Sequence, residues 1–89
     1  MENTMKLSDT VGMMNDIDYK ERFKAEYYQT KIRYEKLKAF NNRIEAAKLM
    51  NEAEPEHDCP IELLKQQQSA MGEYLHILEV RAIIEEIEL

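Results

Sequence analysis

Residues that interrupt helices are scarce in this sequence: its 89 residues include only two glycines and two prolines. A sandwich or barrel of many short strands needs many more turn residues, so the composition argues against an all-β fold. Charged residues make up 34% of the chain, and common residue types here, such as Glu, Lys, Leu and Ala, form helices readily. The length leaves room for one small domain, and we predict that it is all-α.

Cysteine is also scarce, since Cys59 is the only one. A single cysteine can form no internal disulfide and no zinc site of several thiolates, a pattern typical of reducing compartments. The N-terminal residues contain no apolar run of signal-peptide length, and the longest aliphatic run, residues 82–84, is far too short to span a bilayer. We therefore expect a cytoplasmic protein with no membrane partner.

The balance of charge is acidic, with a net charge of −6. Strong binding to a DNA or RNA backbone needs a surplus of Lys and Arg, so we expect no long nucleic acid as partner. The charge is unevenly distributed: residues 19–48 hold nine basic and four acidic residues, whereas residues 49–89 hold two basic and ten acidic residues. Opposite charges on these segments favour antiparallel pairing, which would place Arg33 near Glu79.

The chain divides into an arm and a hairpin. Residues 1–17 lack a sustained periodicity and are predicted to form a flexible N-terminal arm. Residues 18–89 are predicted to form a long antiparallel helical hairpin, because two long periodic segments flank a polar stretch. We expect helix 1 at about residues 19–52, the turn at 53–59 and helix 2 at about 60–87.

Start and stop signals support these boundaries. Asp18 followed by Glu21 is a capping-box pattern that marks the start of helix 1. Pro55 lies in the polar stretch that is read as the turn. Cys59 is a small residue that suits a helix cap, and Pro60 suits the first helical position, where its missing N–H is not needed.

The apolar residues of the two helices recur at steps of three and four, as in a coiled coil. Helix 1 carries one such stripe, made of Phe23, Tyr27, Thr30, Tyr34, Leu37, Asn41 and Ile44. Helix 2 carries two, and the one that we call the first seam consists of Ile61, Leu64, Gln68, Met71, Leu75, Leu78 and Ala82. The second seam, on an adjacent face, consists of Leu63, Gln67, Ala70, Tyr74, Ile77, Arg81 and Ile84.

Two seams on one helix predict self-association. Only one of them can pack on helix 1 of the same chain. The other needs a partner from elsewhere, as do four more apolar residues: Val80, Ile83, Ile87 and Leu89. We expect that partner to be a second copy of the chain, so that the hairpins assemble into a homo-oligomer.

Motifs that carry catalysis do not occur in the sequence: it has no Gly-rich phosphate loop, no nucleophile elbow and no HExxH. His57, Asp58 and Cys59 are consecutive, and three adjacent residues cannot all point at one ion. We therefore expect no catalytic residue, no metal site and no cofactor, and a protein that is not an enzyme.

Polar residues interrupt the second seam at intervals of seven: Gln67, Tyr74 and Arg81. Buried in an apolar stripe, they need partners. One interpretation is that they satisfy one another or a neighbouring subunit, with Arg81 paired to a glutamate. The other is that they face an anionic ligand at a subunit junction. Arg33 and Lys36, from the basic run of helix 1, are further candidate ligand-binding residues.

The order Leu63-Leu64, Gln67, Met71, Tyr74, Leu78, Arg81 in helix 2 follows a helix-1 stretch running from Phe23 to Phe40. Together they resemble the helical hairpin of small phage and prophage proteins, which include anti-CBASS sponges and Thoeris anti-defence sponges. The resemblance covers roughly residues 19–84.

This resemblance implies a non-enzymatic homo-oligomer, commonly a hexamer, in the cytoplasm of an infected bacterial cell. Such a sponge captures cyclic oligonucleotide or cyclic ADP-ribose signals between subunits and withholds them from a defence effector. Gln67, Tyr74 and Arg81 are the positions that match, so the resemblance implies that they contact the ligand. The alternative is a helical protein-binding module, such as a phage inhibitor that docks on a host protein.

Overall fold

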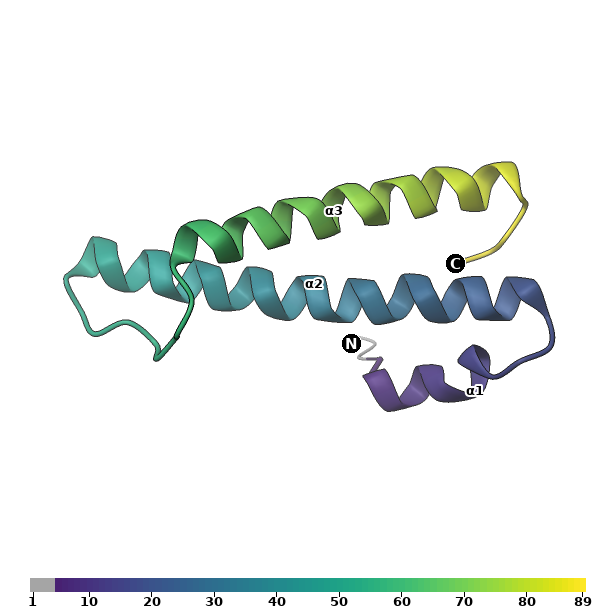
Figure 1. Ribbon diagram of the computed structural model, residues 1–89, viewed down its shortest axis with the longest axis horizontal. Coiled ribbons are helices and arrows are strands. Elements are labelled where there is room, and N and C mark those ends of the chain that lie inside the picture. The colour runs from purple at the N-terminus through teal and green to yellow at the C-terminus, as the bar shows by residue number, and fades with distance from the viewer. Residues whose placement is uncertain (1–4) are drawn as a thin grey trace.

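Two long antiparallel helices dominate the computed structural model, which describes residues 5–89 (Figure 1). They are α2, Tyr19–Met50, and α3, Ile61–Ile84. A 3-10 helix, η1 (Leu7–Thr10), and a single helical turn, α1 (Val11–Met14), precede them. The molecule measures 50 × 27 × 24 Å, and the 32 residues of α2 account for its length, because a helix rises 1.5 Å per residue. The predicted all-α hairpin is confirmed.

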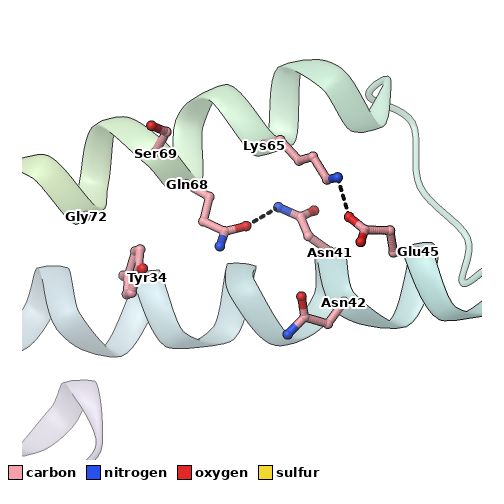
Figure 2. A pocket seen from close by; sticks show the side chains of 8 residues that line it. All are labelled: Tyr34, Asn41, Asn42, Glu45, Lys65, Gln68, Ser69 and Gly72. Carbon is pink, nitrogen blue, oxygen red and sulfur yellow. Dashed lines mark hydrogen bonds and ion pairs between the residues drawn. The ribbon is translucent and has the colours of Figure 1, made fainter.

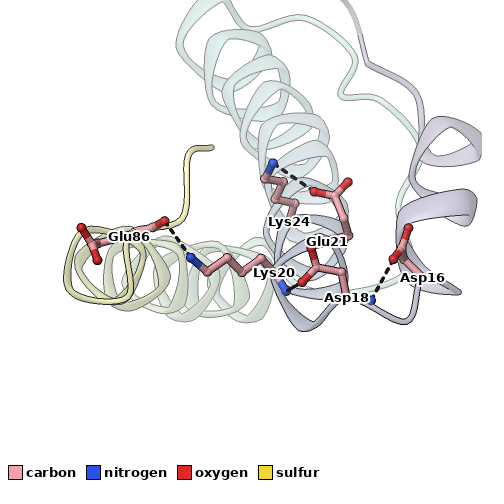
Figure 3. A network of polar contacts seen from close by, with 6 residues as sticks. All are labelled: Asp16, Asp18, Lys20, Glu21, Lys24 and Glu86. Atoms are coloured by element: carbon pink, nitrogen blue, oxygen red, sulfur yellow. Dashed lines mark hydrogen bonds and ion pairs between the residues drawn. The ribbon is translucent and has the colours of Figure 1, made fainter.

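The start of α2 is fixed by Asp18, as the sequence predicts. Its Oδ1 accepts a hydrogen bond from the backbone N of Lys20 at 3.0 Å, which makes Asp18 the N-cap (Figure 3). The second half of the predicted capping box is not formed, because the Glu21 carboxylate pairs with Lys24 Nζ at 3.0 Å. Lys20 Nζ also donates to the backbone O of Glu86 at 3.2 Å, so the start of α2 is attached to the chain beyond α3.

The turn between the long helices begins earlier and ends later than the sequence suggests. Asn51 takes a left-handed conformation, with φ of 57°, and ends α2. The backbone N of Glu52 then donates to Ala47 O at 2.9 Å, which satisfies a carbonyl at the helix end. Pro60 occupies the N-cap of α3 rather than its first helical position.

The far end of α3 corrects one expectation. Glu86 has a φ of 56°, and the backbone N of Ile87 donates to Ala82 O at 2.8 Å, so the chain reverses just after the helix. This reversal buries Ile87, whose exposed fraction is 6%. The prediction that Ile87 joins the exposed second seam is therefore wrong, because the helix ends before reaching it.

A buried apolar cluster lies between α2 and α3, in the half of the hairpin far from the turn, while Ile44 and Ala47 are buried nearer the turn. The buried cluster consists of Phe23, Tyr27, Leu75, Leu78, Ala82 and Ile87. Leu75, Leu78 and Ala82 belong to the first seam, so that seam packs on α2 as predicted. The apolar members of the second seam stay exposed, including Leu63 and Ile77. Even so, within residues 5–89 no helix has both the length and the apolar character to cross a membrane.

The N-terminal arm contains more structure than its sequence indicates. Both η1 and α1 pack against α2. Thr10 is fully buried; its hydroxyl donates to Leu7 O at 2.7 Å and accepts from Gln29 Nε2 at 2.9 Å. Residues 1–4 of the predicted arm lie outside the described residues. The flexibility of the arm stays a prediction.

Tyrosine hydroxyls, rather than the expected ion pair, connect the two helices in the core half. Arg33 is exposed and does not pair with Glu79. Instead, Oε2 of Glu79 accepts a hydrogen bond from the Tyr27 hydroxyl at 2.7 Å. Burial and this hydrogen bond raise the pKa of Tyr27, so the hydroxyl stays a donor. Among residues 5–89, a single ion pair joins α2 to α3, between Glu45 and Lys65. Its basic residue lies on α3 and its acidic residue on α2, the reverse of the expected charge pattern.

Tyr27→Phe should lower stability by about 1 kcal/mol, because the variant loses one hydrogen bond to a carboxylate while keeping its ring in the core. The melting temperature should fall by about 4 to 8 °C. Tyr28→Phe is the matched control, since Tyr28 packs beside Tyr27 against the same cluster, whereas the hydrogen bond to Glu79 comes from Tyr27. Equal melting temperatures for the two variants would show that the Tyr27 hydroxyl contributes nothing.

His57 organises the turn and gives it a pH dependence. Its Nδ1 contacts Cys59 O at 2.7 Å and its Nε2 contacts Glu54 Oε1 at 3.0 Å. These hydrogen bonds, that to Glu54 first, raise the pKa of His57 above its ordinary 6.5. Protonated His57 therefore stabilises the folded protein fully below pH 6.5, and this stabilisation is lost as the pH rises through the raised pKa.

We expect the melting temperature to fall slightly as the pH rises from 6.5 through the raised pKa of His57. His57→Gln should not show this fall, because glutamine does not titrate. An identical fall in both proteins would contradict the role of His57.

Candidate functional site

The five ligand-binding residues predicted from the sequence are all exposed, and they lie on two helices. Arg33 and Lys36 belong to α2, whereas Gln67, Tyr74 and Arg81 belong to α3. The three on α3 share one face, because they are seven residues apart on a continuous helix. None of the five lines either of the two cavities that are described below. The structure of one chain therefore does not gather them into a pocket.

Arg81 has partners within its own chain. Its Nε donates to Glu85 Oε2 at 2.8 Å, and its Nη2 donates to the Tyr19 hydroxyl at 2.8 Å. The guanidinium also lies over the Phe23 ring, with Cζ 4.9 Å from the ring centroid. The hydrogen bond from Arg81 lowers the pKa of Glu85 most, and the one from the Tyr19 hydroxyl lowers it further, so the carboxylate stays charged. A phosphate would have to meet Nη1 of Arg81 or displace Glu85.

The larger of the two cavities lies between α2 and α3, toward the turn, and sequence reasoning did not find it (Figure 2). Its volume is about 440 Å³, within the range of small-molecule sites in proteins. It is lined by Tyr34, Asn41, Asn42, Glu45, Lys65, Gln68, Ser69 and Gly72. The lining is mostly polar, and the cavity opens to solvent, because Asn42, Glu45, Lys65 and Ser69 are exposed.

Two carboxamides form the centre of this cavity. Asn41 Nδ2 donates to Gln68 Oε1 at 2.9 Å, which links α2 to α3 (Figure 2). Asn41 is only 1% exposed, and its Oδ1 has no hydrogen-bond partner among the described residues. Leaving a buried acceptor unpaired costs about 1 to 3 kcal/mol. An apolar pair would avoid this cost, so the amide pair is the feature of the hairpin that packing does not explain.

Tyr34 closes one end of the cavity against α3. A Cβ atom at Gly72 would lie 3.2 Å from Tyr34 Cε1, so the absence of a side chain at position 72 gives the ring its space. A second cavity of about 210 Å³ lies beyond, and Tyr34 and Gly72 line it too. Their contact therefore forms the wall between the two cavities.

The charges around the larger cavity cancel. Lys65 and Glu45 are the charged residues of the lining, and they form an ion pair with each other (Figure 2). The remaining polar groups are amides and hydroxyls, which donate and accept hydrogen bonds without carrying charge. Within residues 5–89 there is no cluster of three acidic, His or Cys side chains that could hold a metal ion. The cavity is therefore suited to an uncharged polar group.

A sequence signal for this cavity exists but is weak. Asn41 lies in the stripe of helix 1 and Gln68 in the first seam of helix 2, so each is a polar residue at a position that faces the other helix. Reversal of the chain between them brings the two amides opposite one another. The remaining lining residues, among them Asn42 and Ser69, follow no pattern in the sequence.

Comparison with known proteins identifies the family. A search of curated proteins found no match, and neither did a search of solved structures. The family model described as Sequestin matches residues 17–84, which take in α2, the turn and α3. The finer assignment to anti-CBASS or Thoeris sponges is not tested by this match and stays a prediction. Because the match covers about three quarters of its length, the chain belongs to the Sequestin family.

Proposed function

We propose that this protein is a phage-encoded, non-enzymatic sponge, which binds cyclic nucleotide immune signals and keeps them from the effectors of bacterial anti-phage defence. The observation that carries the proposal is membership of the Sequestin family, because that name suggests sequestration. The ligands we propose are cyclic oligonucleotides or molecules of the cyclic ADP-ribose type. The site of action is the cytoplasm of an infected bacterial cell.

The exposed second seam supports assembly of several copies. Leu63 is 54% exposed, Ile77 50% and Ile84 74%, although all three are large apolar residues on one face of α3. Val80 and Ile83 nearby are exposed too. Apolar residues gathered in this way are typical of an interface. In our proposal a second copy covers them, and a closed homo-oligomer, such as a hexamer, results.

Three of the five residues proposed to bind the ligand lie on this same face of α3. Tyr74 is 39% exposed, so its ring is accessible for stacking on a base. Gln67 and Arg81 are exposed on either side of it along α3. Arg33 and Lys36 are exposed on α2, from which a neighbouring subunit could contribute positive charge. Each subunit junction would then combine a ring, an amide and several cations, a combination suited to a cyclic nucleotide.

Arg81→Ala should weaken capture of the cyclic nucleotide by about 10- to 150-fold, the effect of losing a hydrogen bond of about 1.5 to 3 kcal/mol to a charged group. Arg43→Ala is the matched control, because Arg43 is exposed and lies over a phenylalanine ring, as Arg81 does. Isothermal titration with cyclic dinucleotides and cyclic ADP-ribose measures the affinity, and circular dichroism checks the fold.

Two outcomes of this experiment would count against the proposal. If Arg81→Ala folds and binds cyclic nucleotides as tightly as Arg43→Ala does, Arg81 is not part of the ligand site. Its role would then be limited to its hydrogen bonds with Glu85 and Tyr19. Recovery of a chemically altered ligand after incubation would contradict a non-enzymatic role.

A helical protein-binding module is the second candidate, favoured by the same exposed apolar face. In that case α3 presents Leu63, Ile77 and Ile84 to a host protein rather than to another copy of the chain. The purified protein would then be a monomer that binds no cyclic nucleotide. Those two results together would replace the sponge by the docking module.

A further inference from the structure

We propose that the cavity between Asn41 and Gln68 binds an uncharged nucleobase-class heterocycle within each hairpin. This inference rests on the proposed function and deepens it, because it assigns a base of the nucleotide ligand to a second site, separate from the exposed face of Tyr74 and containing none of the five residues proposed above.

The hydrogen-bonding groups call for a ligand that both donates and accepts. Asn41 Oδ1 is buried and has no partner within the described residues, so a ligand at this point must offer an N–H or O–H. Gln68 Oε1 is already occupied by Asn41 Nδ2, and Figure 2 shows the amide nitrogen of Gln68 directed away from Asn41. The cavity therefore offers one acceptor, on Asn41, and one donor, on Gln68, and a base carries groups of both kinds on its ring.

The charge of the lining argues against a phosphate in this position. Lys65 is the cation of the cavity, and its ion pair with Glu45 offsets its charge. A phosphate placed here would meet one neutralised cation and a carboxylate, whereas phosphate sites collect unpaired cations or backbone N–H groups. An uncharged heterocycle meets no such repulsion, so the phosphate of a nucleotide would stay outside the cavity.

The cavity also has room for a ring. It lies between two helices, and the aromatic ring of Tyr34 closes one end. A tyrosine ring offers a stacking surface to any base. A volume of about 440 Å³ falls in the range of sites for small organic molecules.

Nuclear magnetic resonance titration of the full chain tests this inference, with adenosine, guanosine, cytidine and uridine as uncharged probes and ribose 5-phosphate as the phosphate probe. At least one nucleoside should shift the side-chain amide signals of Asn41 and Gln68, while ribose 5-phosphate leaves them in place. The inference is overturned if no nucleoside moves these signals at millimolar concentration, or if ribose 5-phosphate moves them equally.

Asn41→Leu separates binding from folding. The variant removes the unpaired acceptor and fills part of the cavity, so nucleoside affinity should fall roughly tenfold or more while the melting temperature does not decrease. If Asn41→Leu does not fold, Gln68→Met is the alternative test, because it removes the other amide while keeping a side chain of similar length. Gln66→Ala is the matched control, because Gln66 is exposed on α3 and does not line the cavity. Unchanged nucleoside affinity in a folded Asn41→Leu would refute the inference.

Failure of this inference is distinguishable from failure of the proposed function. If cyclic nucleotides bind equally to wild type and Asn41→Leu, the sponge stands and the base lies elsewhere. If nucleosides shift the two amides but no cyclic nucleotide binds, the cavity stands and the sponge does not.

Discussion

Leu78→Asp is expected to abolish folding. Leu78 is 1% exposed and packs with Phe23, Leu75 and Ala82 between the two long helices. A carboxylate there would be buried without a partner, which costs several kcal/mol. Domains of this size are stable by only about 5 to 15 kcal/mol, and so small a core leaves little reserve. Far-ultraviolet circular dichroism should show the loss of most helical signal and of cooperative melting.

Leu49→Asp is the control for this substitution. Leu49 is 83% exposed near the end of α2, so the same change of side chain meets water instead of the core. Its circular dichroism should match that of the wild type, and its melting temperature should fall by only a few degrees, because an acidic residue in the last turn of a helix is mildly unfavourable. A cooperative transition in Leu78→Asp at the wild-type temperature would mean that α2 and α3 do not pack through the first seam.

Ile77→Asp, one residue away, is expected to abolish assembly and to spare the fold. Ile77 is 50% exposed and belongs to the second seam, so a charge there stays hydrated in a single chain. In the proposed homo-oligomer it would be forced into an apolar contact between copies, at a cost of several kcal/mol for each interface. Light scattering should report the 10.6 kDa monomer for Ile77→Asp, with helical content unchanged.

Leu49→Asp again provides the comparison, because it alters an exposed apolar residue outside α3 and should keep the wild-type mass. Two results would contradict the proposed interface. One is an unchanged assembly in Ile77→Asp, and the other is a wild-type protein that is itself a monomer at micromolar concentration.

The parts of the fold that depend on neighbouring residues were predictable from the sequence. Asp18 caps α2 because its side chain needs only the two residues that follow it. The helical period places Leu75, Leu78 and Ala82 on one face, and that face is the one buried against α2. Both helices therefore follow from local patterns, with ends that shift by a few residues.

Features set by long-range contacts were not predictable. The charge pattern predicted that Arg33 lies near Glu79, but the carboxylate of Glu79 instead accepts a hydrogen bond from the hydroxyl of Tyr27. The reversal that buries Ile87 depends on a left-handed Glu86, and glutamate does not mark such a position in a sequence as glycine does. Exposed charges exert only weak, screened forces, so they did not determine the register.

The candidate site illustrates the same limit of local patterns. Gln67, Tyr74 and Arg81 could be grouped from the sequence because they share a helix face, and they do lie on one face of α3. The cavity at Asn41 and Gln68 depends instead on the register of two helices. A polar residue in an apolar stripe signals that something must satisfy it, but the sequence does not show how much space surrounds it.

Native mass spectrometry of the full chain, with and without cyclic dinucleotides, cyclic trinucleotides and cyclic ADP-ribose, tests the sponge most directly. We expect a multimer of the 10.6 kDa chain that gains the mass of at least one of these molecules and releases it unchanged on denaturation. A monomer that takes up none of them would contradict the proposed sequestration of cyclic nucleotides.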